Sequence, residues 1–532
     1  MKRLFALTLA LAMMFSLFAG CSKEEPTATT AAPATEAGKT DTTTAAPVES
    51  GNKRTDIVIG VTSDVVSPDP HNQNDTASGK VIHMMFDTLL YMNGDGEYEP
   101  CLAESWENTS DTEYIFHLRK GVKFHNGVEM TAKDVKFTVE RCMESAKTAQ
   151  ATDSVDHVEI IDDYTVKIVT KYPFAPFYST VAASTKLAIL PSEYVAECDA
   201  KSETAFQEAP IGTGPMKFDS WAPNNYFKVV RNDDYWNGTP VTTSITVRVV
   251  PEATSLTIAL ETGEVDIVES VQAVDIQRVK DNADLKWIEQ VQGSVTYLGM
   301  NYAKEPYNNT NLRKAIAYGI DREAIIDVIL EGNGSILNSV FPPMMPAYDE
   351  TIEGYNYDIE KAKQYLAEAG YPDGGLSLEI ATSGDERNRI AQLIQSDLSK
   401  IGIEISIELL EWGAYLEYVG GTSHEMFILG WSNAYEPDGN MFDTFHKDRP
   451  STTNRSNFKN DEISAKIEEA RQELDWSKRE ALYKELQAMI MAEPVWIPLF
   501  AKTAVIGMNK GLEGVEFEPI TQFTYVNAYV NE

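Results

Sequence analysis

The stretch ITVRVVPEATSLTIALETGEVDIVES, residues 245–270, contains the strand–helix–strand pattern that decides the fold class. Residues 245–249 alternate between apolar and polar side chains, which is typical of a half-buried strand. Pro251 predicts the first turn of a helix, whose apolar stripe continues until Gly263. Residues 265–268 predict a second strand. A crossover this short joins parallel strands in a right-handed βαβ unit.

A second unit of this kind is expected at residues 376–411, where two alternating segments flank a helical pattern over residues 389–400. A further strand is expected over residues 425–430. Two such units, far apart in the sequence, predict two α/β lobes. Ligands of open parallel sheets lie beyond the carboxyl ends of the strands. By this rule, the expected ligand loops are residues 65–68, 250–253, 382–387 and 430–438.

Composition argues against several classes of protein. The 532 residues are 43% hydrophobic and 24% charged, which is ordinary for a packed globular chain, and this length predicts two or three lobes. A net charge of −36 excludes a protein that binds nucleic acid through a basic surface. His424 and Glu425 begin the zinc motif H-E-x-x-H, but Ile428 holds its fifth position. We therefore predict no catalytic residue, no metal and no cofactor, and no enzyme activity.

The first residues predict secretion and lipid attachment. Lys2 and Arg3 precede an uncharged apolar stretch, so residues 1–20 are expected to form a signal peptide, with an uncleaved membrane helix as the less favoured alternative. The F-A-G-C ending resembles a bacterial lipobox, which predicts a lipid on Cys21 and a location on the extracytoplasmic face of the cell membrane. Residues 21–52 are rich in Thr, Ala and Pro and predict a flexible tether. The other cysteines, expected to be mostly buried thiols, are Cys101, Cys142 and Cys198.

Ten stretches between residues 55 and 530 match one family in their order along the chain. Four of them are PIGTGPMKFDSW (210–221), LRKAIAYGIDREAI (312–325), GWSNAYEPDGNMFDTFH (430–446) and EPVWIPLF (493–500). They resemble the extracellular solute-binding proteins of family 5, the oligopeptide and dipeptide receptors of ABC importers. The resemblance implies an α/β fold, a periplasmic-binding-protein-like clamshell of two α/β lobes with an inserted third lobe and a two-strand hinge. The expected lobes are lobe I (53–100, 210–296 and 501–532), the inserted lobe Ib (101–209) and lobe II (297–500).

For function, the resemblance implies a lipid-anchored receptor that captures oligopeptides or dipeptides by closing its lobes. It would deliver them to an ABC permease dimer with its ATPase subunits, act as a monomer, and touch the membrane through its lipid anchor alone. Alternatives with the same fold are receptors for a nickel chelate, glutathione or an oligosaccharide, and Trp412, Tyr415 and Trp431 would suit stacking on a sugar. Further alternatives are a surface signalling or adhesion lipoprotein and an enzyme such as a wall hydrolase.

The loop after Trp431 departs from the family pattern. Peptide binders of the family place an Asp three residues after this Trp to pair with the ligand α-amine, and here that residue is Ala434. Either Glu436 or Asp438 therefore takes the amine, or the ligand is not a free-amine peptide. Arg387 is expected to pair with a ligand carboxylate, with a surface salt bridge as the alternative. The full set of expected ligand-binding residues is Val65, Ser67, Arg387, Gly430, Trp431, Ser432, Asn433, Glu436 and Asp438.

Overall fold

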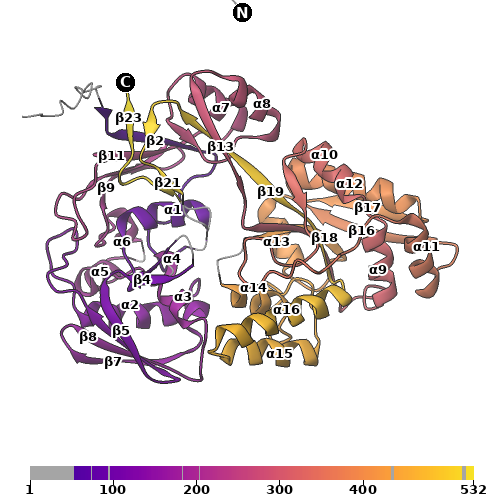
Figure 1. Ribbon diagram of the computed structural model, residues 1–532, viewed down its shortest axis with the longest axis horizontal. Coiled ribbons are helices and arrows are strands. Elements are labelled where there is room, and N and C mark those ends of the chain that lie inside the picture. Colours follow the sequence, from indigo (N-terminus) through magenta and orange to yellow (C-terminus); the bar gives the residue numbers. More distant parts are fainter. Residues whose placement is uncertain are drawn as a thin grey trace, which may run out of the picture. The chain divides into compact units, whose positions relative to one another are not determined.

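Figure 1 shows the computed structural model of the protein, whose described residues are 53–73, 75–93, 96–182, 184–202, 204–432, 436–517 and 523–532. The predicted signal peptide, the lipidation site Cys21, the tether and the site residue Asn433 lie outside these ranges. Within them, no helix combines the length and the apolar character that a membrane crossing requires.

The main sheet contains both predicted α/β units. Its strands are β2 (Asp56–Val61), β9 (Met216–Ala222), β10 (Tyr226–Arg231), β11 (Ser244–Val249), β12 (Ile267–Val268), β13 (Leu285–Val291), β14 (Ser294–Met300), β15 (Gly334–Ile336), β16 (Leu376–Thr382), β17 (Ile403–Leu409), β18 (Met426–Ser432) and β19 (Trp496–Asn509). The order is β17-β16-β18-β14-β19-β12-β2-β11-β10-β9, and β13 and β15 also pair with β19. Near one end β16 is parallel to β17 and β18, and near the other β2 is parallel to β11 and β12. The predicted parallel arrangement is therefore confirmed.

Two helices make the predicted crossovers. Helix α7 (Ala253–Glu261) connects β11 to β12, and α12 (Gly384–Ser399) connects β16 to β17. Glu252 caps α7 by accepting two backbone N–H groups with its carboxylate, so this helix begins two residues after Pro251. Because the carboxylate already satisfies these N–H groups, the proline is not needed at the first helical position.

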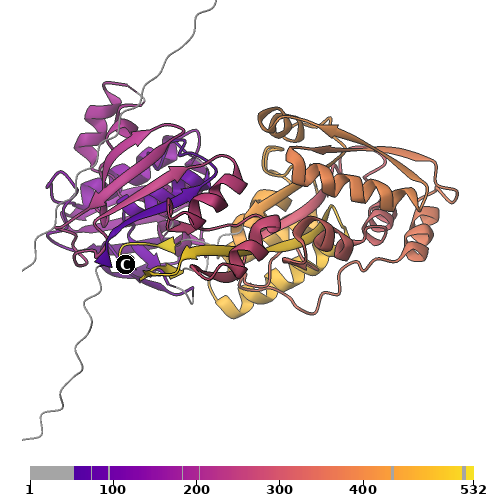
Figure 2. The same cartoon turned by 90° about the horizontal axis from the view of Figure 1, so that it is seen from above.

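Strand β19 passes from one group of strands to the other. Residues 496–500 of β19 pair with β14, and residues 503–509 pair with β13. Strands β13 and β14 follow one another in the chain. β19 therefore changes its partner from β14 to β13 at residues 500–503, opposite residues 291–296, where the chain passes from β13 to β14. The strand can be followed in yellow in Figure 2. A hinge between the predicted lobes I and II would therefore consist of these two adjacent segments.

The segment between Leu89 and Ile189 has a core of its own. Its four-stranded antiparallel sheet follows the order β5-β6-β8-β7. The elements are β5 (Ala103–Ser110), β6 (Glu113–Leu118), β7 (Val155–Asp162), β8 (Thr165–Thr170), α2 (Ala132–Glu144) and α3 (Phe177–Ala182). Phe116, Val135 and Ile168 are completely buried between this sheet and α2. This core, called the inserted lobe below, lies mostly within residues 101–209, which the sequence assigns to lobe Ib, but it also includes Leu89 and Leu90 of the expected lobe I.

The largest apolar cluster draws all its residues from 295–501 and so exceeds the predicted lobe II, residues 297–500, by Val295 and Ala501. At its centre, the rings of Tyr297 and Trp496 stack with centroids 3.5 Å apart. Its helices, besides α12, include α9 (Thr310–Tyr318), α10 (Arg322–Leu330), α11 (Ile359–Glu368), α13 (Trp412–Val419), α14 (Pro437–Phe445), α15 (Asp461–Gln472) and α16 (Trp476–Ala492). The exact lobe limits stay a prediction.

The remaining elements are short or belong to the smaller apolar clusters. They are β1 (Lys53–Arg54), β3 (Leu90–Met92), β4 (Tyr98–Pro100), β20 (Leu512–Glu513), β21 (Glu516–Phe517), β22 (Phe523–Thr524), β23 (Tyr529–Asn531), α1 (Thr76–Met85), α4 (Ser184–Leu187), α5 (Ser192–Asp199), α6 (Ala205–Glu208) and α8 (Ala273–Asp281). Strand β1 pairs with β23, so the first and last strands of the described body lie side by side. Cys101, Cys142 and Cys198 are free thiols, and the last two are buried.

Candidate functional site

The edge of β18 that faces away from β14 is open over its last residues. β18 pairs with β14 along its whole length but with β16 only at its first two residues. The Tyr415 hydroxyl donates to the Ile428 carbonyl at 2.6 Å, so this carbonyl points away from β14. In an antiparallel pair, the backbone groups of successive residues point alternately toward and away from the partner strand. The N–H and C=O groups of Gly430 and Ser432, two and four residues after Ile428, therefore also point away from β14. Among the described residues, no backbone hydrogen bond engages them on that side.

Gly430 leaves open space at this edge. It is exposed, and a Cβ atom added to it would have the Val295 carbonyl oxygen at 3.7 Å as its nearest neighbour, an ordinary contact. Trp431 is half-buried against the lobe II cluster, and Ser432 is exposed. Packing within the protein therefore does not require a glycine here, whereas the close approach of another backbone would.

Arg387 is a cation beside the same sheet edge with no acidic partner among the described residues. It lies in the first turn of α12, its guanidinium is 5.0 Å from the ring centre of Trp412, and it donates to the Ser383 carbonyl at 3.4 Å. The ring centre of Trp412 lies 5.8 Å from that of Tyr415, the residue that donates to the Ile428 carbonyl, so Arg387 reaches the β18 edge through these two rings. The alternative of a surface salt bridge is not formed in the described part of the chain.

The two acids of the loop after Trp431 are paired with arginines. Glu436 forms an ion pair with Arg479 and caps α14 by accepting the backbone N–H of Asp438. Asp438 is buried, and its Oδ1 lies 3.1 Å from Nε of Arg471. Burial raises the pKa of Asp438 to about 7, and the charge of Arg471 opposes the increase. An ammonium ion would have to share either carboxylate with a buried guanidinium. That one of these acids binds a ligand amine stays a prediction.

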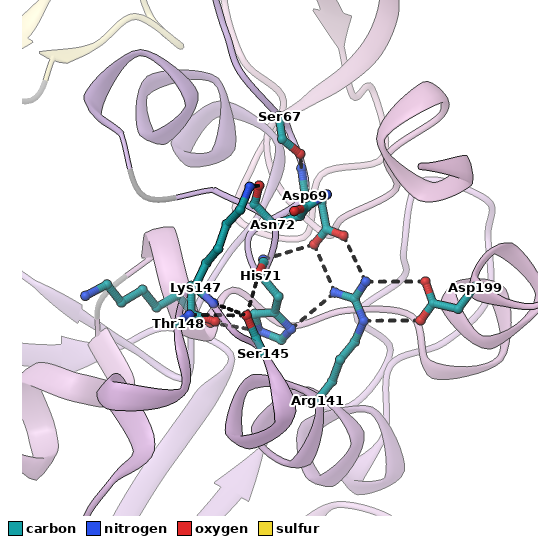
Figure 3. Close-up of polar contacts among 10 residues, drawn as sticks. Ser67, Asp69, His71, Asn72, Arg141, Ser145, Lys147, Thr148 and Asp199 are labelled. Atoms are coloured by element: carbon teal, nitrogen blue, oxygen red, sulfur yellow. Dashed lines mark hydrogen bonds and ion pairs between the residues drawn. The ribbon is translucent and has the colours of Figure 1, made fainter. Parts of the chain in front are cut away.

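The loop after β2 is fixed by contacts with the helix of the inserted lobe, as Figure 3 shows. Arg141 in α2 holds both oxygens of Asp69 at 2.8 and 2.9 Å, and Asp199 lies 3.3 Å away on its other side. The His71 ring donates through Nε2 to the Lys186 carbonyl at 2.9 Å and accepts from Arg141 through Nδ1 at 3.2 Å. The ring is therefore neutral, in keeping with burial that lowers its pKa to about 4.

Within this loop, the predicted residues Val65 and Ser67 have buried side chains. Their backbone N–H groups are also engaged, by Asp64 at 2.8 Å and by the Ser78 hydroxyl at 3.1 Å. The side chain between them, Val66, is 61% exposed. The rule that ligands lie beyond the ends of strands thus points to this loop, but the expected ligand-binding residues omit its exposed apolar side chain, Val66. That Val65 and Ser67 contact a ligand stays a prediction.

No metal centre is visible in the described ranges, where no three His, Cys, Asp or Glu side chains gather as ligands. His424 of the incomplete zinc motif is buried, and its Nε2 donates to the Arg455 carbonyl at 2.8 Å. The site therefore offers a main-chain edge and a cation that have no partner of their kind among the described residues, together with aromatic side chains, and these are groups that bind a solute.

Comparison with known proteins identifies the class. Over residues 97–453, the sequence matches the family described as bacterial extracellular solute-binding proteins, family 5 middle. Heme-binding protein A of Haemophilus influenzae is 29% identical over 457 residues, 81% of this chain and 83% of that protein. Di/tripeptide-binding protein 2 of Pseudomonas aeruginosa is 29% identical over 468 residues, 82% of this chain and 88% of that protein.

Among solved structures, the ABC transporter-associated periplasmic binding protein DppA of Helicobacter pylori, in complex with the peptide STSA, has a TM-score of 0.80. It is 30% identical, and the similarity covers 90% of this chain and 99% of that chain. The protein is thus a bacterial extracellular solute-binding protein with an α/β, periplasmic-binding-protein-like fold, as the sequence predicts. It belongs to family 5 of these proteins.

Proposed function

We propose that the protein captures a short peptide, extended along the open edge of β18, and delivers it to an ABC permease dimer with its ATPase subunits. The observation that carries this proposal is the backbone of Gly430 and Ser432, which points away from β14, together with Arg387, which has no acidic partner in the described part of the chain. A main-chain edge binds peptides of many sequences by strand addition, and a guanidinium binds a carboxylate bidentately. Two matched proteins, named for binding di- and tripeptides or solved with a peptide, support a peptide as solute.

Side chains around this edge would complete the site. Trp431 and the 44% exposed Trp412 would flank the peptide, while Ser432 would extend the main-chain edge. That Asn433 contacts the solute stays a prediction. The loop with Val65, Val66 and Ser67 would contact the peptide from lobe I. No bond is made or broken in this scheme, so the receptor needs no catalytic residue, metal or cofactor.

Closure about the two adjacent segments near residues 291–296 and 500–503 would bury the solute between lobes I and II. Because the segments lie side by side in the sheet, they favour one bending motion over twisting in several directions. The closed monomer would be the form that the permease recognises.

Mass spectrometry of the solute that is released from the purified protein tests the proposal. Short peptides would support it. A nickel chelate, glutathione, heme or an oligosaccharide would assign the same fold to another solute. Failure of ligand-free protein to bind any member of a pool of di- to pentapeptides would contradict it.

Gly430→Val should weaken peptide binding by at least about tenfold without unfolding the protein. A β-branched side chain would narrow the approach to the β18 edge, while the nearest protein atom to a Cβ at this position is 3.7 Å away. Isothermal titration with the peptide pool measures the loss. Gly439→Ala, an exposed position with no atom within 4 Å of its Cβ, is the matched control. Equal affinities of both variants would contradict the strand-addition geometry.

We also propose that Cys21 carries a lipid and that residues 21–52 form the tether between membrane and body. Cys21→Ser should release the protein into the medium or leave it with its signal peptide attached, because a hydroxyl cannot replace the thiolate in thioether formation. Membrane fractionation and the mass of the mature N-terminus measure this. A processed Cys21→Ser protein that stays in the membrane would contradict lipid anchoring.

A further inference from the structure

Arg471 is held in lobe II by three partners. Its Nε lies 3.1 Å from Asp438, its guanidinium carbon lies 3.4 Å from the ring centre of Phe442, and Glu468 lies 3.7 Å from NH1. These partners belong to α14 and α15, and the Arg471 side chain is 6% exposed. The guanidinium is thus fixed in position and largely removed from water, so any further partner meets a preorganised cation.

The further partner comes from the inserted lobe. Phe174 lies in the connection between β8 and α3, and its ring centre is 5.3 Å from the Arg471 guanidinium. The next residue, Ala175, donates its backbone N–H to the Arg471 carbonyl at 2.9 Å. Phe174 belongs to the apolar cluster of the inserted lobe, whereas Ala470, the neighbour of Arg471, belongs to the cluster of lobe II. Two separate cores therefore meet at Arg471.

Arg449 makes a second tie between the same two parts. It pairs with Asp443 of α14 at 2.8 Å and with Asp153 of the inserted lobe at 3.6 Å. Its guanidinium also lies 4.9 Å from the ring centre of Phe442, the ring on which Arg471 packs. Both arginines thus bring the inserted lobe to the same helix, α14, which directly follows the candidate ligand loop.

We propose that these contacts form a clasp between the inserted lobe and lobe II, with Arg471 as its pivot, that stabilises the closed protein. The role of the clasp in holding a solute rests on the proposed function, whereas its existence does not. Opening must separate Phe174 and Ala175 from Arg471. A cation–π contact together with one hydrogen bond of this kind shifts a two-state equilibrium by roughly 5- to 30-fold. In this view Asp438 positions Arg471.

Hydrogen–deuterium exchange at the Ala175 amide tests the clasp in the full chain with no solute added. Phe174→Ala should speed exchange of this amide by roughly 5- to 30-fold, because it removes the ring that holds the connection against Arg471. The amides of Val166 and Ile168 in β8 should keep their wild-type rates. Ile160→Ala, an exposed position in β7 of the same lobe, is the matched control and should change none of these rates.

Phe174→Leu keeps an apolar side chain in the core of the inserted lobe but removes the aromatic face, and should speed Ala175 exchange about fivefold. If Phe174→Ala also speeds the exchange of the β8 amides, the inserted lobe itself is destabilised, and the Phe174→Leu measurement then decides whether the clasp exists. Two results would overturn the clasp: a wild-type Ala175 amide that exchanges as fast as an unstructured one, or unchanged exchange in Phe174→Leu. Failure of the wild type to bind the peptide pool contradicts the proposed function and leaves this measurement intact.

Discussion

Replacement of Arg387 by Gln should weaken the binding of peptides with a free carboxylate by about 30- to 4000-fold. The guanidinium lies over Trp412 and has no acidic partner among the described residues, so a solute carboxylate would be its one strong counter-charge. Truncating one partner of a desolvated charge pair costs about 2–5 kcal/mol, which corresponds to this range of affinities. Because no ion pair between described residues is lost, the stability of the protein should change little.

Isothermal titration with a tripeptide pool and with its C-terminally amidated counterpart measures the effect. The amidated pool should bind wild type and Arg387→Gln equally, since it brings no charge to pair. Arg389→Gln is the matched control, because this neighbouring side chain donates to the Val328 carbonyl at 3.2 Å. Equal losses in both variants, or none in either, would remove Arg387 from the site.

The protein should also lose stability steeply as the pH falls from about 6.5 to 4. Burial lowers the pKa of His71, His83, His125 and His424 to about 4 in the folded protein. In the unfolded chain a histidine titrates near 6.5, so between these two values the unfolded state binds more protons and acid favours it. The difference amounts to about 3 kcal/mol of unfolding free energy for each histidine. Four of them together reach the total stability of a typical domain, about 5–15 kcal/mol.

His125 shows why these rings stay neutral. Its Nε2 lies 3.0 Å from the Gly214 carbonyl, to which it donates, and its Nδ1 accepts the backbone N–H of Gly212 at 3.2 Å. A second proton, on Nδ1, would bring its N–H group against the backbone N–H of Gly212. Both ring nitrogens are thus committed to the neutral form, and a proton can bind only when this contact opens.

Urea unfolding at pH 7 and pH 4.5 measures the prediction. The loss of unfolding free energy between these values should be about 2–3 kcal/mol smaller in His125→Gln than in the wild type. His157→Gln is the matched control, because that exposed ring pairs with Asp156 and Glu159 at the surface. Acid also protonates carboxylates and so weakens the repulsion between negative charges in a chain of net charge −36, which stabilises the folded protein. Because both variants share this effect, comparing them cancels it. Parallel pH profiles for both variants would contradict the assignment.

The parallel units could be predicted from the sequence because their signals are local. The alternation in residues 245–249 and the helical spacing in residues 389–400 each depend on neighbours within one element. The strand-end rule likewise indicates Gly430 and Arg387 without knowledge of tertiary contacts. The periodicity of apolar residues therefore predicts the helices and strands, their ends and the loops that follow them.

The partners of the loop acids could not be predicted in this way. Arg471 and Arg479 follow Asp438 and Glu436 by 33 and 43 residues and lie on helices that pack together with α14 only in the folded protein. No spacing rule links side chains so far apart. Val66 was missed for a related reason, since an irregular loop has no period that separates its exposed side chain from buried neighbours.

The pairing of β1 with β23 brings the first and last strands of the described body together, so the body should tolerate a circular permutation of its sequence. Lys53 stands opposite Asn531 and Arg54 opposite Val530, so a short linker could join the two ends without disturbing either strand. The backbone could then be cut at an exposed turn such as the one at Gly238, where, apart from its chain neighbours, no atom of the described residues lies within 4 Å of a Cβ. Such a circularly permuted receptor keeps every strand beside its present neighbours, and its unfolding transition should match that of the parent chain.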